Sequence, residues 1–335
     1  TSGSTGRPKG VLMPHRPIMT LITWLREKYP VKDEMILFLN PYTFDMSIWG
    51  LYAWSVNGTS VCVLKHGDER DPSKIVKALS EYPVTSLHLV PSMLTMILEY
   101  IESNPDSIKN ISLKYVFVSG EILNLNIVER FEKCFAGSDA ELINFYGPTE
   151  AHVVSYFRTK DYNNSLHNTI PIGKPITNTR LLVVDKNMNP VPAGITGEIL
   201  LGGDCLADGY LNKVAVTSEK FIYVNNRLTQ GNERYYRTGD LGRWLKDGNI
   251  EFQGRNDFQI KIRGFRVEPG EVQSVINRIE GVKESLVLVK ESTAGSKYLA
   301  AYIVFTDMST FNETYIRQEL KNRLADYMIP ACIIG

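Results

Sequence analysis

The feature that most limits the fold of this chain is an alternation, from about residue 11 to 157, of short apolar runs with segments of helical periodicity. The runs are of strand length, nearly continuous and rich in β-branched residues. They cover residues 35–39, 60–64, 86–90, 115–118 and 141–145. Continuous apolar runs are typical of strands buried on both faces, which occur in parallel sheets connected by helices. We therefore expect a parallel α/β sheet here.

One intervening segment shows the helical part of the pattern clearly. In residues 124–135, apolar side chains recur at spacings of three and four, which places them on one helix face. They are Leu125, Val128, Phe131 and Phe135.

The pattern changes after a polar stretch at residues 158–168. Apolar runs at 180–184 and 198–201 flank a turn-rich segment, and two glycines follow the second run. Short strands separated by turns predict an antiparallel β subdomain over residues 169–256.

The last part of the chain predicts a small α+β domain. Residues 258–263 alternate in polarity, and Val272, Val275, Ile276 and Ile279 share a helix face. Strands at 285–289 and 298–305 and a helix from Glu313 to about Tyr327 follow. We expect a large domain over 1–256, with an α/β subdomain at 1–157, and a small domain over 257–335.

Charge and cysteine content exclude several classes of function. The 335 residues include 37 Lys and Arg against 37 Asp and Glu, so the net charge is zero and no global field attracts nucleic acid or anionic lipid. No apolar stretch is long enough to span a membrane. Four widely spaced cysteines without a CxxC pair argue against disulfide and zinc frameworks, and favour a reducing, cytoplasmic location.

Residues 1–10 have the composition of a polyphosphate-binding loop. Glycines let backbone N–H groups converge on an anion, hydroxyls donate hydrogen bonds and a lysine adds charge. The residues concerned are Thr1, Ser2, Gly3, Ser4, Thr5, Gly6 and Lys9. The spacing is not that of a Walker A loop, because Lys9 follows Gly6 at three positions. The alternative is a flexible Gly/Ser linker.

This run resembles the phosphate loop of the adenylate-forming superfamily, which includes nonribosomal peptide synthetase adenylation domains, acyl-CoA and aryl-CoA ligases and luciferases. Further family motifs follow in order: FDMS (44–47), NFYGPTE (144–150), GEILLGG (197–203) with GYL (209–211), YRTGDL (236–241), GRNDFQIKIRGFRVE (254–268) and YMIP (327–330). Their form is most similar to that of peptide synthetase adenylation domains, which implies that fold.

The motif residues suit a nucleotide and Mg²⁺. The Tyr146 ring can stack on adenine, the Asn144 amide can hydrogen-bond it, and Glu150 offers a hard carboxylate to Mg²⁺. Thr149 can reach the α-phosphate. Asp240 can accept from ribose hydroxyls beside Arg255. The resemblance implies the same roles, adds Gly120, Gly147 and Phe252 to the nucleotide site, and implies catalytic roles for Thr1, Lys9, Thr149 and Glu150.

These groups suit attack by a substrate carboxylate on the α-phosphate of ATP. A carboxylate is already ionised at pH 7, so the site needs positioning and charge neutralisation rather than a general base.

The resemblance to the peptide synthetase branch implies that Asp45, which follows the motif phenylalanine, pairs with the substrate's α-ammonium group. A buried carboxylate needs such a cationic partner, so Asp45 favours an amino acid over a fatty or aryl acid. By resemblance, the other substrate-pocket residues are Met46, Trp49, His88, Phe117, Ser119, Phe145, Val153 and Val154. Large aromatic walls imply a small cavity, and His88 and Ser119 can hydrogen-bond a short polar side chain. The set resembles serine-type pockets but departs from them at Met46, Phe145 and Val154. Threonine or another small amino acid is the alternative, and His88 can equally be a packed strand histidine.

The resemblance also implies a moving C-terminal domain and a carrier. Asp257 matches the family's hinge, and Gly264 matches the position passed by a phosphopantetheine arm on a peptidyl carrier protein domain. Gly264 can equally be an ordinary hairpin glycine. A condensation domain upstream is a further expected partner.

We expect the chain to be a piece of a longer protein, lacking half of the large domain and a later lysine, and to be inactive and poorly stable when isolated. The alternatives to an amino-acid-activating ligase are a stand-alone acyl- or aryl-CoA ligase and a catalytically inactive nucleotide-binding fragment.

Overall fold

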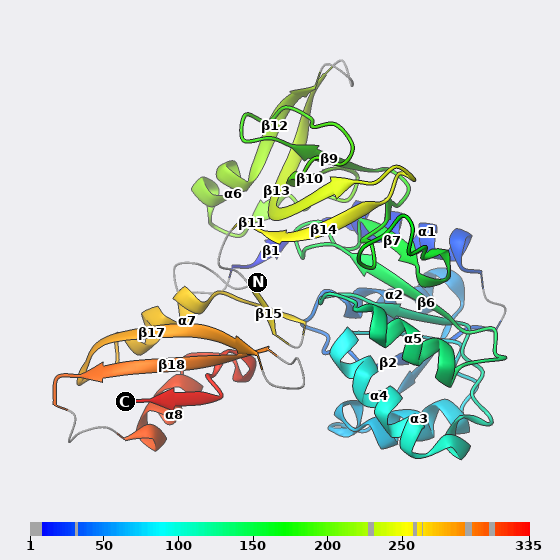
Figure 1. Cartoon of the computed structure of the whole chain (residues 1–335), viewed down its shortest axis with the longest axis horizontal. Coiled ribbons are helices and arrows are strands. Elements are labelled where there is room, and N and C mark those ends of the chain that lie inside the picture. The colour runs from blue at the N-terminus through cyan, green and yellow to red at the C-terminus, as the bar shows by residue number, and fades with distance from the viewer. Residues whose placement is uncertain are drawn as a thin grey trace. The chain divides into compact units, whose positions relative to one another are not determined.

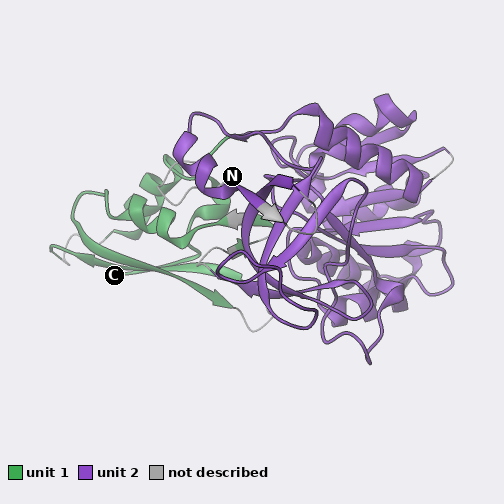
Figure 2. Cartoon of the chain, turned by 90° about the horizontal axis from the view of Figure 1, so that it is seen from above, with its two compact units in different colours: residues 1–10, 257–335 green, residues 11–256 purple. Residues whose placement is uncertain are grey.

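The structure, a computed structural model, describes residues 9–30, 33–226, 231–256, 260–262, 264–291, 297–307 and 312–335. The chain divides into two compact units, residues 11–256 and residues 1–10 with 257–335, which Figure 2 colours separately.

A seven-stranded sheet forms the first part of the larger unit, in the order β3-β2-β4-β5-β6-β7-β8. Its strands are β2 (Met35–Phe38), β3 (Ser60–Val63), β4 (Ser86–Leu89), β5 (Tyr115–Val118), β6 (Glu141–Tyr146), β7 (Ser155–Arg158) and β8 (Lys174–Pro175). All pairs from β3 to β6 are parallel. The predicted parallel strands are therefore confirmed.

Helices cover both faces of this sheet (Figure 1). They are α1 (His15–Lys28), α2 (Ser47–Asn57), α3 (Pro72–Glu81), α4 (Pro91–Ser103) and α5 (Leu125–Cys134), with short 3-10 turns at Asp68–Arg70, Pro105–Ile108 and Thr159–Asp161. In β5, Val116 and Val118 pack against α3, α4 and α5, whereas Phe117 packs against α1 and α2. Successive side chains of a strand face opposite sides, so each strand contributes to both cores.

Two expectations about this sheet need correction. Strand β3 is not buried on both faces: it lies at the sheet edge, and Val63 is 70% exposed. The sheet is also not wholly parallel, since β6 pairs with β7 and β7 with β8 in antiparallel fashion. The loop between β6 and β7 is too short for a crossover helix, so the chain turns back beside β6.

The rest of the larger unit contains the predicted antiparallel sheet, which has five strands ordered β12-β13-β10-β9 with β14 on β13. It begins at Thr179 rather than at the predicted residue 169, because β8 pairs with β7 in the other sheet. Its strands are β9 (Thr179–Val184), β10 (Gly197–Gly203), β12 (Phe221–Asn226), β13 (Gly231–Trp244) and β14 (Ile250–Arg255). Helix α6 (Val214–Lys220) precedes β12, and β1 (Val11–Leu12) pairs with β11 (Gly209–Tyr210). This sheet shares a core with Tyr146 and Val154.

The smaller unit has the predicted α+β composition. Its elements are β15 (Ile260–Ile262), β16 (Phe265–Val267), α7 (Pro269–Ile276), β17 (Val282–Glu291), β18 (Lys297–Phe305), α8 (Glu313–Lys321), a 3-10 turn at Asp326–Met328 and β19 (Cys332–Ile334). Strands β17 and β18 pair antiparallel, and one face of their sheet packs on α7 and α8.

The last helix ends earlier than predicted, at Lys321 rather than near Tyr327. The guanidinium of Arg317 donates to the carbonyl oxygens of Pro330 and Ala331, both at 2.9 Å. These bonds hold the following segment along the helix, so that β19 pairs in parallel with β18. Continuation of the helix would carry the chain away from that pairing.

Candidate functional site

The predicted substrate residues lie where the parallel strands of the seven-stranded sheet end. Asp45 follows β2, Ser119 follows β5, and the loop of residues 147–154 follows β6. Ligands of open α/β sheets bind at the carboxyl ends of the strands, so this edge is the expected position for a site.

An aromatic wall joins four of these residues. The rings of Trp49 and Phe117 lie 4.9 Å apart between centroids, and Phe117 stacks on Phe145 at 4.7 Å. The ring of His88 meets that of Phe145 at 5.7 Å. Val153 packs in the same buried cluster as Trp49. Met46, just before α2, is also buried.

Val154 does not join this wall. It is fully buried in the core of the five-stranded sheet, together with Tyr146. Val153 and Val154 thus pack in two different cores, although they are neighbours in the sequence.

His88 and Ser119 form the polar part of the cluster. His88 Nε2 and Ser119 Oγ are 3.0 Å apart, and both residues are buried. Burial, with a smaller contribution from repulsion by His152, lowers the pKa of His88 to about 3. The imidazole is therefore neutral at pH 7, and the pair offers hydrogen bonds without charge.

The low pKa of His88 predicts a pH dependence of stability. Below pH 6.5 the unfolded state binds a proton that the folded state does not, so stability is complete above pH 6.5 and falls with pH towards pH 3. His88 should cost about 2 kcal/mol of unfolding free energy between pH 6.5 and 5. Urea unfolding of wild type and His88→Asn at pH 7, 6 and 5 measures this, and the variant should show a flatter dependence.

The matched control is His66→Asn, because His66 is exposed. The unfolding free energy of this variant should depend on pH as steeply as that of wild type. If the unfolding free energy of His88→Asn depends on pH as steeply as that of wild type, the burial of a neutral imidazole is contradicted.

Asp45 is half-buried at the start of α2. Its carbonyl oxygen accepts from the Ile48 N–H at 3.1 Å and lies 2.8 Å from Nε2 of His152. His152 belongs to the loop after β6, which also carries Glu150. Burial lowers the pKa of His152, although the Asp45 carboxylate opposes that shift.

The predicted nucleotide residues form a hydrogen-bonded group where β6 meets the five-stranded sheet. The Tyr146 hydroxyl donates to Oδ2 of Asp240 at 2.6 Å, and Arg255 pairs with Oδ1. Arg255 Nη2 also donates to the Thr238 carbonyl at 3.1 Å. The Asn144 amide donates to the Pro171 carbonyl at 2.8 Å. Burial and the Asp240 charge raise the pKa of Tyr146 well above its ordinary value, so its hydroxyl keeps its proton.

Glu150 is fully buried, and its Oε1 accepts from the Tyr210 hydroxyl at 2.6 Å. The Tyr210 and Tyr236 hydroxyls are 3.4 Å apart, which extends the chain of polar groups. Burial, then the Glu150 charge, raises the pKa of Tyr210. The two tyrosines stand inside the GYL and YRTGDL motifs, yet sequence reasoning gave them no role.

The Glu150 carboxylate suits the way in which Mg²⁺ usually binds beside a nucleotide. Within the described ranges, no group of three or more His, Cys, Asp and Glu residues could hold a metal ion. Mg²⁺ typically uses one or two carboxylates together with substrate phosphates and water, so a single buried carboxylate suits that mode.

The structure also describes four other residues that were predicted to bind the nucleotide. Thr149 is half-buried beside Glu150, and Phe252 packs on the core of the five-stranded sheet. Gly120 has φ +89°. A Cβ on Gly147 would lie 1.5 Å from the His152 carbonyl oxygen, so only glycine fits there.

The remaining predicted residues belong to the smaller unit. Gly264 has φ +79° next to the Ile262–Phe265 pair that closes the β15–β16 hairpin. Lys9 is described and is assigned to the same unit. Thr1, Ser2, Gly3, Ser4, Thr5, Gly6 and Asp257 lie outside the described residues.

Comparison with known proteins decides the family. The family model described as "AMP-binding enzyme" matches residues 1–211. The chain belongs to the AMP-binding enzyme family. A mycosubtilin synthase subunit of Bacillus subtilis is 44% identical over 341 residues, which cover all of this chain and 13% of that protein.

Solved structures agree with this assignment. Holo-PA1221, an NRPS protein containing adenylation and PCP domains, is 26% identical with a TM-score of 0.84, covering all of this chain and 56% of that one. The Vibrio cholerae adenylation domain AlmE, in complex with glycyl-adenosine-5'-phosphate, is 24% identical with a TM-score of 0.86, covering 100% and 62%. The predicted adenylation fold is confirmed.

This AMP-binding family chain spans only about an eighth of the mycosubtilin synthase protein that it matches. Among the helices of its described residues, none combines the length and apolar character that crossing a membrane requires.

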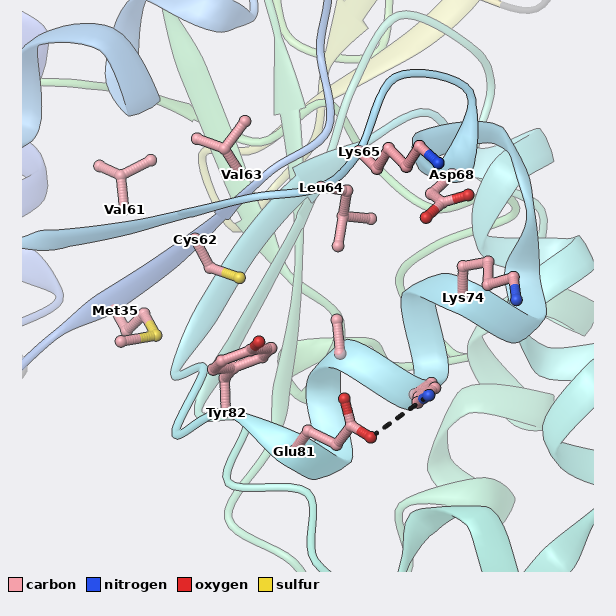
Figure 3. A pocket seen from close by; sticks show the side chains of 12 residues that line it. Met35, Val61, Cys62, Val63, Leu64, Lys65, Asp68, Lys74, Glu81 and Tyr82 are labelled. Atoms are coloured by element: carbon pink, nitrogen blue, oxygen red, sulfur yellow. Dashed lines mark ion pairs between the residues drawn. The ribbon is translucent and has the colours of Figure 1, made fainter.

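A separate surface pocket of about 490 Å³ lies between β3 with its following loop and α3 (Figure 3). Cys62, Lys74 and Tyr82 are among its lining residues, and Lys77 pairs with Glu81 at its rim. It shares no residue with the predicted substrate and nucleotide sites.

Proposed function

We propose that this chain activates an amino acid with ATP, as the adenylation part of a nonribosomal peptide synthetase. The observation that carries the proposal is the half-buried Asp45, whose carbonyl oxygen lies 2.8 Å from Nε2 of His152, at the carboxyl ends of the strands, where Tyr146 and Glu150 also lie. An α-ammonium group is the natural partner of such a carboxylate. The peptide-synthase relative and the NRPS structure support the same activity.

In the proposed reaction, a carboxylate oxygen of the amino acid attacks the α-phosphorus of ATP. An O–P bond forms to the α-phosphorus, the bond from that phosphorus to the bridging oxygen breaks, and pyrophosphate leaves with the electron pair. Asp45 holds the ammonium group, while Tyr146, Asp240 and Arg255 orient the nucleoside. Glu150 would hold Mg²⁺ and Thr149 would bind the α-phosphate. The loop that contains Thr1 and Lys9 is predicted from its composition to bind phosphate. Mg²⁺ would neutralise phosphate charge when bound.

We propose serine as the amino acid. The rings of Trp49, Phe117 and Phe145 pack closely against one another, which disfavours a large side chain, and the neutral His88–Ser119 pair can hydrogen-bond a hydroxyl. An apolar side chain would form no hydrogen bond with this pair, so a hydroxyl-bearing side chain is favoured over those of alanine and valine.

We further propose that the aminoacyl group passes to a carrier protein's phosphopantetheine. The thiolate attacks the carbonyl carbon, a C–S bond forms, the bond from that carbon to the phosphate oxygen breaks, and AMP leaves with the electron pair. The adenylation and PCP domains of PA1221 support this partnership. In this proposal residues 257–335 form the moving domain, Asp257 is its hinge and Gly264 leaves space for the arm. Four free thiols, Cys62, Cys134, Cys205 and Cys332, support a cytoplasmic location.

The test is ATP–pyrophosphate exchange by the complete protein that carries this chain, assayed with each of the twenty amino acids. Serine should give the fastest exchange. Exchange with bulky apolar amino acids alone would contradict serine. Absence of exchange with all twenty, together with thioester formation from a fatty or aryl acid and CoA, would favour a stand-alone CoA ligase instead.

A further inference from the structure

His152 bridges two separate parts of the proposed site. The residue is buried, and its φ of +56° lies in the left-handed region that L side chains rarely adopt. Both ring nitrogens have partners: the Val153 N–H donates to Nδ1 at 2.9 Å, and Nε2 lies 2.8 Å from the Asp45 carbonyl oxygen. A carbonyl only accepts, so Nε2 carries the proton and donates to it.

At one end of this bridge is the segment that holds the Asp45 carboxylate. The Asp45 carbonyl also accepts from Ile48 at the start of α2, and the Asn40 amide donates to the His88 carbonyl at 2.8 Å. Rotation of the Asp45 peptide would turn the carboxylate away from its present direction. The His152 bond opposes that rotation.

At the other end is the loop that carries Glu150. The Val154 N–H donates to the Tyr146 carbonyl at 2.8 Å, and the Ala207 N–H donates to the Glu150 carbonyl at 2.9 Å. The close approach of Gly147 to the His152 carbonyl completes a tightly closed loop. His152 therefore joins two segments that are each fixed by other bonds.

We propose that His152 is a positioning residue that holds Asp45 for the substrate ammonium group by hydrogen-bonding its peptide carbonyl from the Glu150 loop. This role rests on the proposed function, because it assigns Asp45 to an amino acid. His152 itself touches neither substrate nor nucleotide in this role.

Two conservative variants separate its two hydrogen bonds. In His152→Asn, the amide oxygen can replace Nδ1 as acceptor for Val153, but the side chain is too short to reach Asp45. In His152→Gln, the amide nitrogen can replace Nε2 as donor to Asp45, while the Val153 bond is lost. Asparagine tolerates a positive φ better than glutamine does, so the Asn variant should be the more stable.

The experiment measures KM for the amino acid and for ATP in pyrophosphate exchange, and the melting temperature, for the complete protein. His152→Asn should raise the amino-acid KM about tenfold, the usual scale of one lost hydrogen bond to a polar group, with the ATP KM unchanged. His152→Gln should keep the amino-acid KM within about threefold of wild type but melt at a lower temperature.

The matched control is His167→Asn. His167 is equally buried, and it bonds through both nitrogens to groups outside the site: Nε2 lies 2.8 Å from Asp247, and the Asn163 N–H donates to Nδ1 at 3.1 Å. This variant should lower the melting temperature and leave both KM values unchanged.

The outcomes separate the two proposals. Amino-acid KM values that follow melting temperature across the variants, or remain at the wild-type value in His152→Asn, would overturn the positioning role alone. Absence of amino-acid-dependent exchange by wild type would overturn the proposed function and, with it, this role.

Discussion

Asp45→Asn is expected to lower kcat/KM for the amino acid by about 30- to 1000-fold, equivalent to about 2–4 kcal/mol. The change removes the charge that, in the proposed function, pairs with the substrate ammonium group, and it leaves the side-chain volume unchanged. It also preserves the backbone carbonyl that accepts from His152. The loss should therefore reflect substrate binding, and the ATP KM should change little. Pyrophosphate exchange at varied amino-acid concentration measures it.

Glu34→Gln supplies the matched control for Asp45. Glu34 is a half-buried carboxylate that accepts from Ser86 Oγ at 2.9 Å, at the opposite, amino end of the same sheet. Its neutralisation should leave kcat/KM at the wild-type value. An Asp45→Asn variant with wild-type kinetics would exclude the carboxylate as the ammonium site.

Glu150→Gln is expected to reduce kcat/KM for MgATP by about 100-fold or more, because under the proposed function it removes a carboxylate that would hold Mg²⁺, and the bound ion would supply several kcal/mol of charge stabilisation. The Gln amide oxygen can still accept from the Tyr210 hydroxyl, so the melting temperature should stay close to that of wild type. Titration with Mg²⁺ at fixed ATP should show half-saturation at a higher concentration.

Tyr210→Phe tests the same site without removing the carboxylate. It deletes the O–H donor that holds Oε1 of Glu150, and orienting groups of this kind typically contribute about tenfold to metal affinity. The Mg²⁺ concentration at half-saturation should therefore be lowest for wild type, higher for Tyr210→Phe and highest for Glu150→Gln. Identical Mg²⁺ dependence in all three would exclude Glu150 as a ligand.

The sequence predicts the fold well because its strongest signals are local. Each predicted run of the parallel sheet contains a strand, and the 124–135 helix is present as α5 within one residue at either end. Strand β19 is not predicted, because its pairing depends on Arg317 holding two carbonyls 13 and 14 residues away. The exposure of β3 likewise follows from its position at the edge of the sheet, and the periodicity of the sequence does not predict the order of strands in a sheet.

The candidate site likewise contains some contacts that the sequence predicts and others that only the structure shows. The aromatic residues Trp49, Phe117 and Phe145 meet as the resemblance implies. Val154 does not join them, because it packs in the core of the five-stranded sheet, and the motif spacing that suggested it does not reveal this. The bond from His152 to Asp45 joins residues 107 positions apart, and only the three-dimensional fold reveals it.

The wall of the proposed substrate cluster is also part of the protein's core. Behind it, Trp24 of α1 lies 5.9 Å from Phe145, and Tyr29 lies 5.3 Å from Phe117. Truncation of a buried phenylalanine typically costs about 3–5 kcal/mol, so a change of substrate made at these positions also weakens the fold. Evolutionary or engineered drift towards larger amino acids therefore requires compensating changes on α1.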